Sequence, residues 1–288
     1  MASILLTGAS RGIGMAAALV LGRAGHKVYA TMRNPSAAPE LGRKAAEEGL
    51  PIEVSTMDVN SDASVKEAIG AIEESGLAID VLVNNAGIET RGSVEELRLS
   101  EFRAVMETNY FGALRCIKAV LPGMRARKDG CIVNITSVAG RISSSPLGAY
   151  AASKFALEGL SEALAQEAKM FNIRVAIVQP GIIDTAMARR IGEGPNGSVY
   201  PHQHRFAGLF TASLLNPASP FLVAEKIRDV IESGTWKLRH PVGPDAEPFL
   251  EWRSAMTDEE FVDWGAADDE TWYENVGRDF GLDARLSE

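Results

Sequence analysis

The sequence has only two cysteines, Cys116 and Cys131, among its 288 residues. One stands in a helix-like segment and the other in an apolar strand-like run. Both are therefore expected to be reduced, buried thiols and not parts of a disulfide framework. His202 and His204 form a His-x-His pair with no third ligand close by in the sequence, a pattern typical of a loop. We expect no metal site.

Long apolar runs are also missing. No run approaches the roughly 20 residues that a membrane-spanning helix needs. The N-terminus enters the strand-like Ile4-Leu5-Leu6 with no basic segment before it, so no secretion signal is indicated. These observations predict a cytoplasmic protein without a membrane span.

Basic residues are scarce at the C-terminal end. Residues 241–288 hold 14 acidic and 3 basic residues, a net charge of −11, whereas residues 1–240 hold 24 acidic and 26 basic residues, a net charge of +2. An acidic tail repels nucleic acids, and the rest of the chain shows no basic cluster that would bind them. We therefore expect no nucleic-acid partner.

The acidic tail is nevertheless rich in aromatics. Three of the four tryptophans, Trp252, Trp264 and Trp272, lie within residues 244–288. Such side chains favour docking over disorder. We expect residues 244–288 to form an extension that packs on the surface of the main domain, residues 1–243; covering a pocket and joining a subunit interface are the alternatives.

What the sequence has in abundance is alternation of strand-like and helix-like segments. Apolar, β-branched runs predict seven strands, and amphipathic segments between them predict helices, among them Met15–Ala24, Ser61–Glu74 and Ser100–Ala126. This order is typical of a doubly wound parallel α/β sheet of the Rossmann type with right-handed crossovers. The expected strands are Ile4–Leu6, Lys27–Thr31, Ile52–Thr56, Ile79–Val83, Cys131–Ile135, Asn172–Gln179 and Trp236–His240.

A glycine-rich turn joins the first strand to the first helix, with the sequence Thr7-Gly8-Ala9-Ser10-Arg11-Gly12-Ile13-Gly14. Glycines there permit a tight turn and let backbone N–H groups approach a pyrophosphate at the positive end of the helix. The turn therefore predicts a dinucleotide site.

The residues after the second strand, Thr31-Met32-Arg33-Asn34, include no acid. Rossmann proteins that prefer NAD usually place an Asp or Glu near this point, about 20 residues beyond the glycines, where it binds the ribose 2′-hydroxyl. The guanidinium of Arg33 instead suits a 2′-phosphate, and Arg11 can approach it from the glycine turn. We expect NADP(H), with NAD(H) as the less favoured cofactor.

The segment Gly130–Gly159 reads as strand, loop and helix. Ser137 follows the strand at the edge where parallel sheets place their chemistry. Tyr150 and Lys154 are four residues apart, so they share a face of the following helix. Because a nearby cation favours the phenolate, we expect Lys154 to lower the pKa of Tyr150 from its usual value of about 10. Tyr150 is the predicted acid/base group.

These motifs together resemble the short-chain dehydrogenase/reductase family over residues 3–240. The shared features are Thr7-Gly8-x3-Gly12-x-Gly14, Asp58, Asn84-Asn85-Ala86-Gly87, Asn109, Ser137, Tyr150-x3-Lys154 and Pro180-Gly181. The resemblance implies a seven-stranded sheet and carbonyl/alcohol oxidoreduction with a nicotinamide cofactor. It implies that Tyr150 transfers the proton, Ser137 holds the substrate oxygen, Lys154 binds the nicotinamide ribose and Asn109 anchors a water in a proton relay.

With the glycine turn and the two arginines, the resemblance yields one predicted set of cofactor-binding residues: Gly8, Ser10, Arg11, Gly12, Ile13, Gly14, Arg33, Asp58, Val59, Asn85, Ala86, Gly87, Tyr150, Lys154, Pro180, Gly181, Ile183 and Thr185. The segments 28–33 and 150–159 are most similar to the retinol and 17β-hydroxysteroid dehydrogenase type.

Substrate contacts are expected from residues 182–217, which mix apolar side chains with the glycine-rich segment 192–197 and so resemble a mobile lid over an apolar pocket. A surface excursion with a docked helix is the alternative. The expected substrate is a small apolar ketone, aldehyde or secondary alcohol, and we expect a homo-oligomer, a dimer or a tetramer. An acyl-thioester ketoreductase and a non-catalytic dinucleotide-binding regulator remain alternatives; the acidic tail disfavours the first, and Ser137, Tyr150, Lys154 and Asn109 together disfavour the second.

Overall fold

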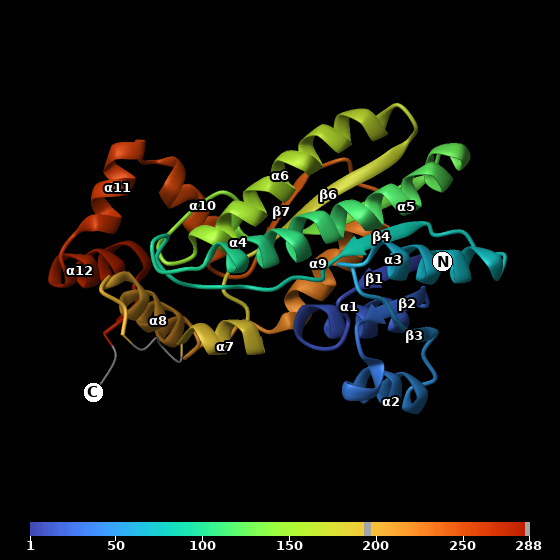
Figure 1. Cartoon of the computed structure of the whole chain (residues 1–288), viewed down its shortest axis with the longest axis horizontal. Coiled ribbons are helices and arrows are strands. Elements are labelled where there is room, and N and C mark those ends of the chain that lie inside the picture. The colour runs from blue at the N-terminus through green and yellow to red at the C-terminus, as the bar shows by residue number, and fades with distance from the viewer. Residues whose placement is uncertain (193–196, 286–288) are drawn as a thin grey trace.

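The computed structural model describes residues 1–192 and 197–285. Seven parallel strands form one sheet in the order β3-β2-β1-β4-β5-β6-β7 (Figure 1). The strand order reverses between β1 and β4, the switch point at which doubly wound sheets open a crevice. The predicted seven-stranded Rossmann-type sheet is confirmed. Its strands are β1 Ser3–Thr7, β2 Lys27–Met32, β3 Ile52–Thr56, β4 Val81–Asn84, β5 Gly130–Ile135, β6 Ile173–Pro180 and β7 Arg239–Val242.

Helices cover both faces of this sheet, because alternate strand residues point to opposite sides. Ile4 and Leu6 of β1 face a core under α1 (Gly12–Arg23), α2 (Glu40–Glu47) and α9 (Pro220–Glu232). Leu5 faces the second core, under α3 (Asp62–Glu74), α5 (Gly112–Arg127) and α6 (Gly148–Lys169). The central strand β1 is thus apolar on both sides, as buried parallel strands must be.

The predicted helix Ser100–Ala126 is interrupted in the structure. It consists of α4 (Leu99–Met106), a π-helical turn (Glu107–Phe111) and α5. A π-helical turn widens the helix by one residue and often marks a functional site. Here the turn carries Asn109 and directs its side chain into the protein interior.

Other boundaries also differ from the prediction. The last strand begins at Arg239 and not at Trp236, because Thr235 Oγ1 accepts a hydrogen bond from the Lys237 N–H at 3.1 Å and so makes a turn there. The fourth strand begins at Val81 and not at Ile79. Helix α2 was not predicted, although its buried residues Leu41 and Ala45 are spaced as on one face of a helix.

The segment after β6 and the C-terminal extension lie together at one end of the molecule (Figure 1). The first contributes α7 (Ala186–Gly192) and α8 (His202–Ser213); the second contributes α10 (Ala246–Ser254), α11 (Asp258–Ala266) and α12 (Asp269–Phe280). We call α8 and α10–α12 the cap. Its own apolar core includes Phe206 and Phe210 of α8 and Trp272 and Val276 of α12.

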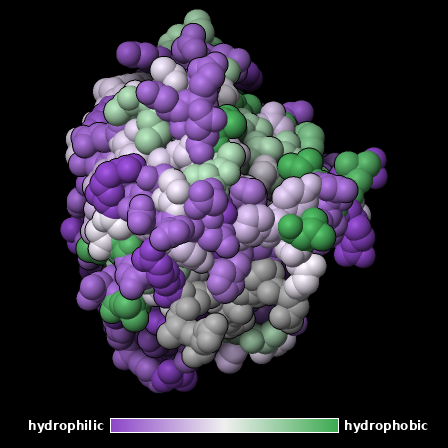
Figure 2. All heavy atoms as spheres, turned by 90° about the vertical axis from the view of Figure 1, so that its left-hand side faces the viewer, coloured by the Kyte–Doolittle hydropathy of each residue, from purple (hydrophilic) through white to green (hydrophobic). Residues whose placement is uncertain are grey.

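A buried arginine joins the two parts of the cap. Arg205 of α8 donates from Nε to Asp269 Oδ1 at 2.6 Å and from an Nη to the Ala267 carbonyl at 2.8 Å. The outer face of the cap is largely hydrophilic, with scattered apolar residues (Figure 2). In residues 1–192 and 197–285, no helix is both long enough and apolar enough to cross a bilayer.

Candidate active site

A cavity of about 630 Å³ opens along the carboxyl ends of the strands and extends under the cap. Every residue of the predicted cofactor-binding set lines it, and so does Ser137. These residues lie together because in a parallel sheet all the loops that lead from a strand to a helix lie at the same edge.

The glycine turn is hydrogen-bonded to the segment that follows β4. Thr7 Oγ1 accepts hydrogen bonds from the N–H groups of Asn85 and Ala86, at 3.1 and 3.0 Å. Asn85 Nδ2 returns two bonds of 3.0 Å to the carbonyls of Thr7 and Gly8. A Cβ at Gly14 would overlap the Gly8 carbonyl oxygen and lie 2.5 Å from Asn85 Nδ2. Only glycine fits at position 14.

The same turn leaves the N-terminus of α1 open to a ligand. Arg11, the residue that precedes this helix, makes no side-chain capping bond to it. The first N–H groups of a helix have no partners within the helix and carry positive partial charge. An uncapped helix start that lies beside tightly packed glycines therefore fits the pyrophosphate of a dinucleotide.

Two exposed arginines stand where the adenosine end of such a ligand would lie. Arg33 follows β2 and Arg11 lies in the glycine turn, and both line the cavity. Met32 beside them is 3% exposed, and the segment 31–34 holds no carboxylate. The local charge at this end is therefore positive.

Ser137 and Tyr150 both line the cavity, and their side chains are close enough to interact. Ser137 follows β5 and accepts a hydrogen bond from the Ala139 N–H at 3.1 Å, which fixes its side chain. Burial raises the pKa of Tyr150 to about 12; a hydrogen bond with Ser137 opposes this shift, and the charge of Glu89 adds to it. The phenol therefore holds its proton at neutral pH.

Lys154 lies one helical turn beyond Tyr150, with its Nζ 5.6 Å from the centre of the tyrosine ring. Lys154 is 5% exposed, and its ammonium donates to the Ile135 carbonyl at 2.9 Å. Burial lowers the pKa of Lys154 to about 8, with Glu158 opposing. We expected Lys154 to lower the pKa of Tyr150; in this structure burial raises that pKa instead, and the group that opposes the rise is Ser137 and not Lys154.

Asn109 differs from the other predicted catalytic residues because it lies behind the cavity wall. It is 1% exposed, and its Oδ1 accepts from the Ile88 N–H at 2.8 Å. Its Nδ2 donates to the Ile88 carbonyl and to Ser153 Oγ, both at 2.9 Å. Asn109 thus fixes the backbone after β4 against α6, the helix that carries Tyr150.

The other half of the cavity is apolar and aromatic. From the expected substrate segment it is lined by Ile182, Met187, Phe206, Leu209 and Phe210, and from the extension by Phe249, Trp252, Phe261, Trp264, Trp272 and Phe280. The extension therefore covers the pocket, which was one of the two alternatives to the packing on the domain surface that we expected. The expected lid is largely helical, and its residues 193–196 lie outside the described part of the chain.

Two of the three indole groups of the cap share one acceptor. Asp279 Oδ2 accepts from Trp264 Nε1 at 2.8 Å and from Trp252 Nε1 at 3.3 Å. The two rings pack edge to face with their centres 4.9 Å apart, a favourable arrangement for aromatic pairs. These contacts give the apolar half of the cavity a defined shape.

Two charged residues that line the cavity were missed by the sequence analysis, Glu89 and Arg190. Glu89 comes two residues after the Asn84–Gly87 motif, and that position is the only signal in the sequence that places it near the site. In residues 1–192 and 197–285, no group of His, Cys, Asp and Glu side chains is arranged to hold a metal ion. Cys116 and Cys131 are both buried free thiols.

Comparison with known proteins agrees with this geometry. The sequence model of the short chain dehydrogenases matches residues 2–196. The chain is 41% identical over 192 residues to a 3-ketodihydrosphingosine reductase of Bacteroides thetaiotaomicron, covering 66% of this chain and 68% of that protein. It is 39% identical over 262 residues to retinol dehydrogenase 8 of Bos taurus, covering 86% and 83%. It is 33% identical over 244 residues to 17-beta-hydroxysteroid dehydrogenase type 1 of Mus musculus, covering 83% and 70%.

Solved structures give the same result. A short-chain dehydrogenase from Streptomyces avermitilis superposes with a TM-score of 0.77 at 32% identity, covering 96% of this chain and 97% of that one. An actinorhodin polyketide ketoreductase variant with NADPH superposes with a TM-score of 0.77 at 30% identity, covering 85% and 97%. The chain therefore belongs to the short-chain dehydrogenase/reductase family, oxidoreductases that bind a nicotinamide dinucleotide, and within it is similar to the retinol and 17β-hydroxysteroid dehydrogenase type.

Proposed function

We propose that this protein interconverts a ketone or aldehyde and the corresponding alcohol on a largely apolar molecule, using NADP(H). One observation carries the proposal: Tyr150 packs against the apolar core of the cap and, together with Ser137, lines the same cavity as the glycine turn. A cofactor against the glycine turn and an apolar substrate under the cap would meet at these two hydroxyls.

The nicotinamide, when bound, supplies or accepts the hydride. In reduction, Ser137 donates a hydrogen bond to the carbonyl oxygen and positions it, and Tyr150 gives that oxygen its proton. The hydride and the proton together convert the carbonyl to an alcohol, and the phenolate that forms is stabilised by the nearby Lys154 ammonium. In oxidation the same groups act in reverse.

The apolar character of the substrate follows from the cap. The residues of α10–α12 that line the cavity are all uncharged. Burying the apolar surface of a substrate against their aromatic rings is favourable at roughly 25 cal/mol per Å². The names of two relatives refer to 3-ketodihydrosphingosine and retinol, which are apolar over most of their length. A carbonyl on a long apolar body is the substrate class that these features favour.

The NADP(H) preference rests on Arg33 and Arg11. Each guanidinium can form charge-assisted hydrogen bonds to a 2′-phosphate, worth about 1.5–3 kcal/mol each. We expect Arg33→Ala to lower the ratio of kcat/KM for NADPH to that for NADH by at least about tenfold. Arg23→Ala is the matched control, because Arg23 is paired with Glu48 on the surface of α1 and does not line the cavity. A wild-type preference for NADH, or an unchanged ratio in Arg33→Ala, would show the assignment to be wrong.

The proposed reaction is tested by following NADPH consumption with linear ketones of increasing chain length. We expect kcat/KM to rise with chain length, because each further methylene enters the aromatic half of the cavity and contributes about 0.8 kcal/mol. If kcat/KM falls with chain length, or if no ketone or aldehyde of the series is reduced and no corresponding alcohol is oxidised, the proposed function is refuted.

A further inference from the structure

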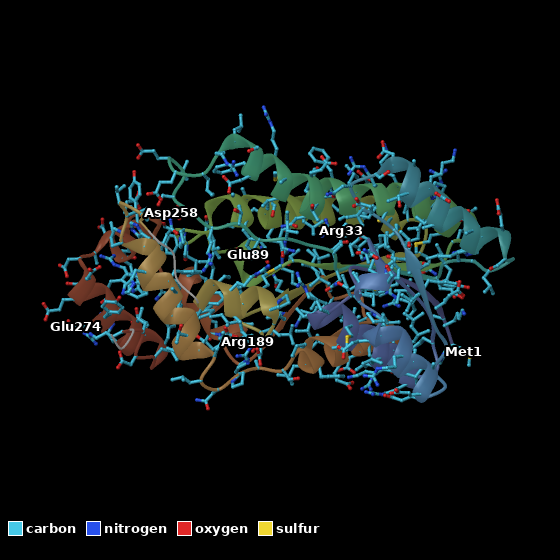
Figure 3. All side chains as sticks on the ribbon, turned by 60° about the horizontal axis from the view of Figure 1, so that its bottom comes forward. Met1, Arg33, Glu89, Arg189, Asp258 and Glu274 are labelled. Carbon is cyan, nitrogen blue, oxygen red and sulfur yellow. The ribbon has the colours of Figure 1, made fainter. Side chains whose placement is uncertain are left out.

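A buried carboxylate lies behind the reacting groups, on the side of α6 that faces the sheet. Acidic residues such as Asp258 and Glu274 lie at the outer end of the cap (Figure 3), whereas Glu158 is only 4% exposed. Burying a carboxylate is costly unless its oxygens find partners. Glu158 Oε1 accepts hydrogen bonds from Thr136 Oγ1 at 2.7 Å and from Gln179 Nε2 at 3.0 Å.

These two partners stand next to residues of the active site. Thr136 immediately precedes Ser137 after β5, and Gln179 immediately precedes Pro180 at the end of β6. The Ser137 hydroxyl lies between the two strand ends, because its Oγ donates to the Pro180 carbonyl at 3.3 Å. Glu158 therefore joins the two strand ends that hold the Ser137 hydroxyl.

The same carboxylate belongs to the helix that carries the acid/base group. Glu158 follows Lys154 by four residues and Tyr150 by eight, so the three residues lie on one side of α6. The turn after Ser137 also packs closely here: a Cβ at Gly140 would lie 2.9 Å from Glu158 Cγ and 3.2 Å from the Lys154 carbonyl oxygen. Glu158 thus connects the side of α6 that carries Tyr150 to the segment that carries Ser137.

A third strand fixes the other oxygen of this carboxylate. Arg239 of β7 donates from Nε to Glu158 Oε2 at 2.8 Å and from an Nη to Glu162 Oε1 at 2.5 Å. Charge-assisted hydrogen bonds of this kind are shorter and stronger than those between neutral groups. The Glu158 side chain is therefore held from β5, β6 and β7 at once, which leaves it a single position.

On the basis of the proposed function, we propose that Glu158 is a positioning residue: it sets the distance between the Tyr150 and Ser137 hydroxyls, which act on the same carbonyl oxygen. A displacement of about 1 Å between groups that react together can lower a rate by about 10²-fold. NADPH binding uses the glycine turn and Arg33, which lie on other strands, so it should not depend on Glu158. The inference therefore predicts a loss in kcat without a loss of cofactor affinity.

The test compares Glu158→Met with Glu162→Met in the reduction of a ketone by NADPH. Each change removes from α6 a carboxylate that binds Arg239 and keeps the length of the side chain. Glu162 is the matched control, because its side chain is 50% exposed and, in residues 1–192 and 197–285, forms no hydrogen bond to β5 or β6. We expect kcat to fall by at least about tenfold in Glu158→Met, with KM for NADPH within about twofold of the wild type. Both values should stay within about twofold in Glu162→Met.

A second pair of variants separates positioning from folding and decides the test if Glu158→Met does not fold. Thr136→Val removes the hydroxyl that donates to Glu158, whereas Thr136→Ser keeps it. We expect kcat to fall in the valine variant and to remain near the wild-type value in the serine variant. Equal losses of kcat in Glu158→Met and Glu162→Met, an unchanged kcat in Glu158→Met, or equal kcat in the two Thr136 variants would overturn the inference.

If the wild type reduces no ketone, the proposed function fails, and crystal structures decide the inference separately. The distance from Ser137 Oγ to Tyr150 Oη should then be at least about 1 Å longer in Glu158→Met, or in Thr136→Val, than in the wild type and in Glu162→Met. An equal distance in all of these structures would show that Glu158 does not position the two hydroxyls.

Discussion

Replacing Arg205 by alanine should loosen the C-terminal extension from α8, the other part of the cap. The Arg205 side chain is 5% exposed, whereas its partner Asp269 is 66% exposed and regains water when the pair is lost. We therefore assign this bond about 1 kcal/mol. The bond to the Ala267 carbonyl and the contact with the Trp272 ring, 5.9 Å from the guanidinium carbon, add about 1 kcal/mol each. The expected loss is ~3 kcal/mol of docking free energy.

This loss has two measurable consequences. Opening of α11 and α12 should become up to ~100-fold more frequent, and proteolysis within them should accelerate accordingly. The KM for a long-chain ketone should rise by at least about fivefold, because the aromatic rings that line the cavity are no longer held. The KM for acetone, which does not reach the cap, should change much less.

Arg253→Ala is the matched control for this variant. Arg253 binds the Met256 carbonyl and the Asp258 carboxylate and lies over the Phe261 ring, all within the extension itself. It does not connect the extension to α8. Its loss should leave the KM for the long-chain ketone within about twofold of the wild type. If Arg205→Ala behaves like Arg253→Ala in both proteolysis and KM, the reasoning that Arg205 docks the extension on α8 is wrong.

Three further predictions concern the sheet side of the site. Gly14→Ala should abolish NADPH binding measured by calorimetry, because the new Cβ overlaps the Gly8 carbonyl oxygen, and normal affinity would contradict the packing argument. Gly159→Ala should instead raise the free energy of unfolding by about 0.5–1 kcal/mol in urea titrations, because an added Cβ at this exposed position of α6 meets nothing within 4 Å. A lower free energy of unfolding would show that the position is constrained. The third is a pH effect of Lys154, whose pKa is about 8 in the folded protein against an ordinary value of 10.5. Between these two pH values the unfolded chain binds a proton that the folded protein does not. The free energy of unfolding of the wild type relative to Lys154→Met should therefore rise by up to ~3 kcal/mol from pH 8 to pH 10.5, and this gain should be lost again as the pH falls through 8. A difference that does not change with pH would refute the burial of the charged group.

The sheet was predictable because its signals are local. A buried parallel strand needs a short, apolar, β-branched run, and the glycine turn needs glycine where a Cβ would collide with the chain, as at Gly14. The strand ends were less certain, because a turn such as the one closed by Thr235 depends on a single side-chain bond.

The cap and the fine chemistry of the site depend on contacts between distant segments. Nothing near Arg205 in the sequence indicates that it binds Ala267 and Asp269, so packing at the domain surface was expected in preference to covering the cavity. The pKa of Tyr150 was expected to fall, since the spacing to Lys154 is visible in the sequence whereas the burial that dominates it is not. Glu89 was missed for the same reason, because its place in the cavity wall appears only when the chain is folded.

Turnover of Tyr150→Phe tests the central claim most directly, because phenylalanine keeps the ring and removes only the hydroxyl that is proposed to carry the proton. The ring still packs on α6, so NADPH binding measured by calorimetry should stay within about twofold of the wild type. The kcat for ketone reduction should fall by roughly 10²–10⁴-fold, the usual loss when a general acid is removed. Turnover close to that of the wild type, with NADPH binding intact, would contradict the account.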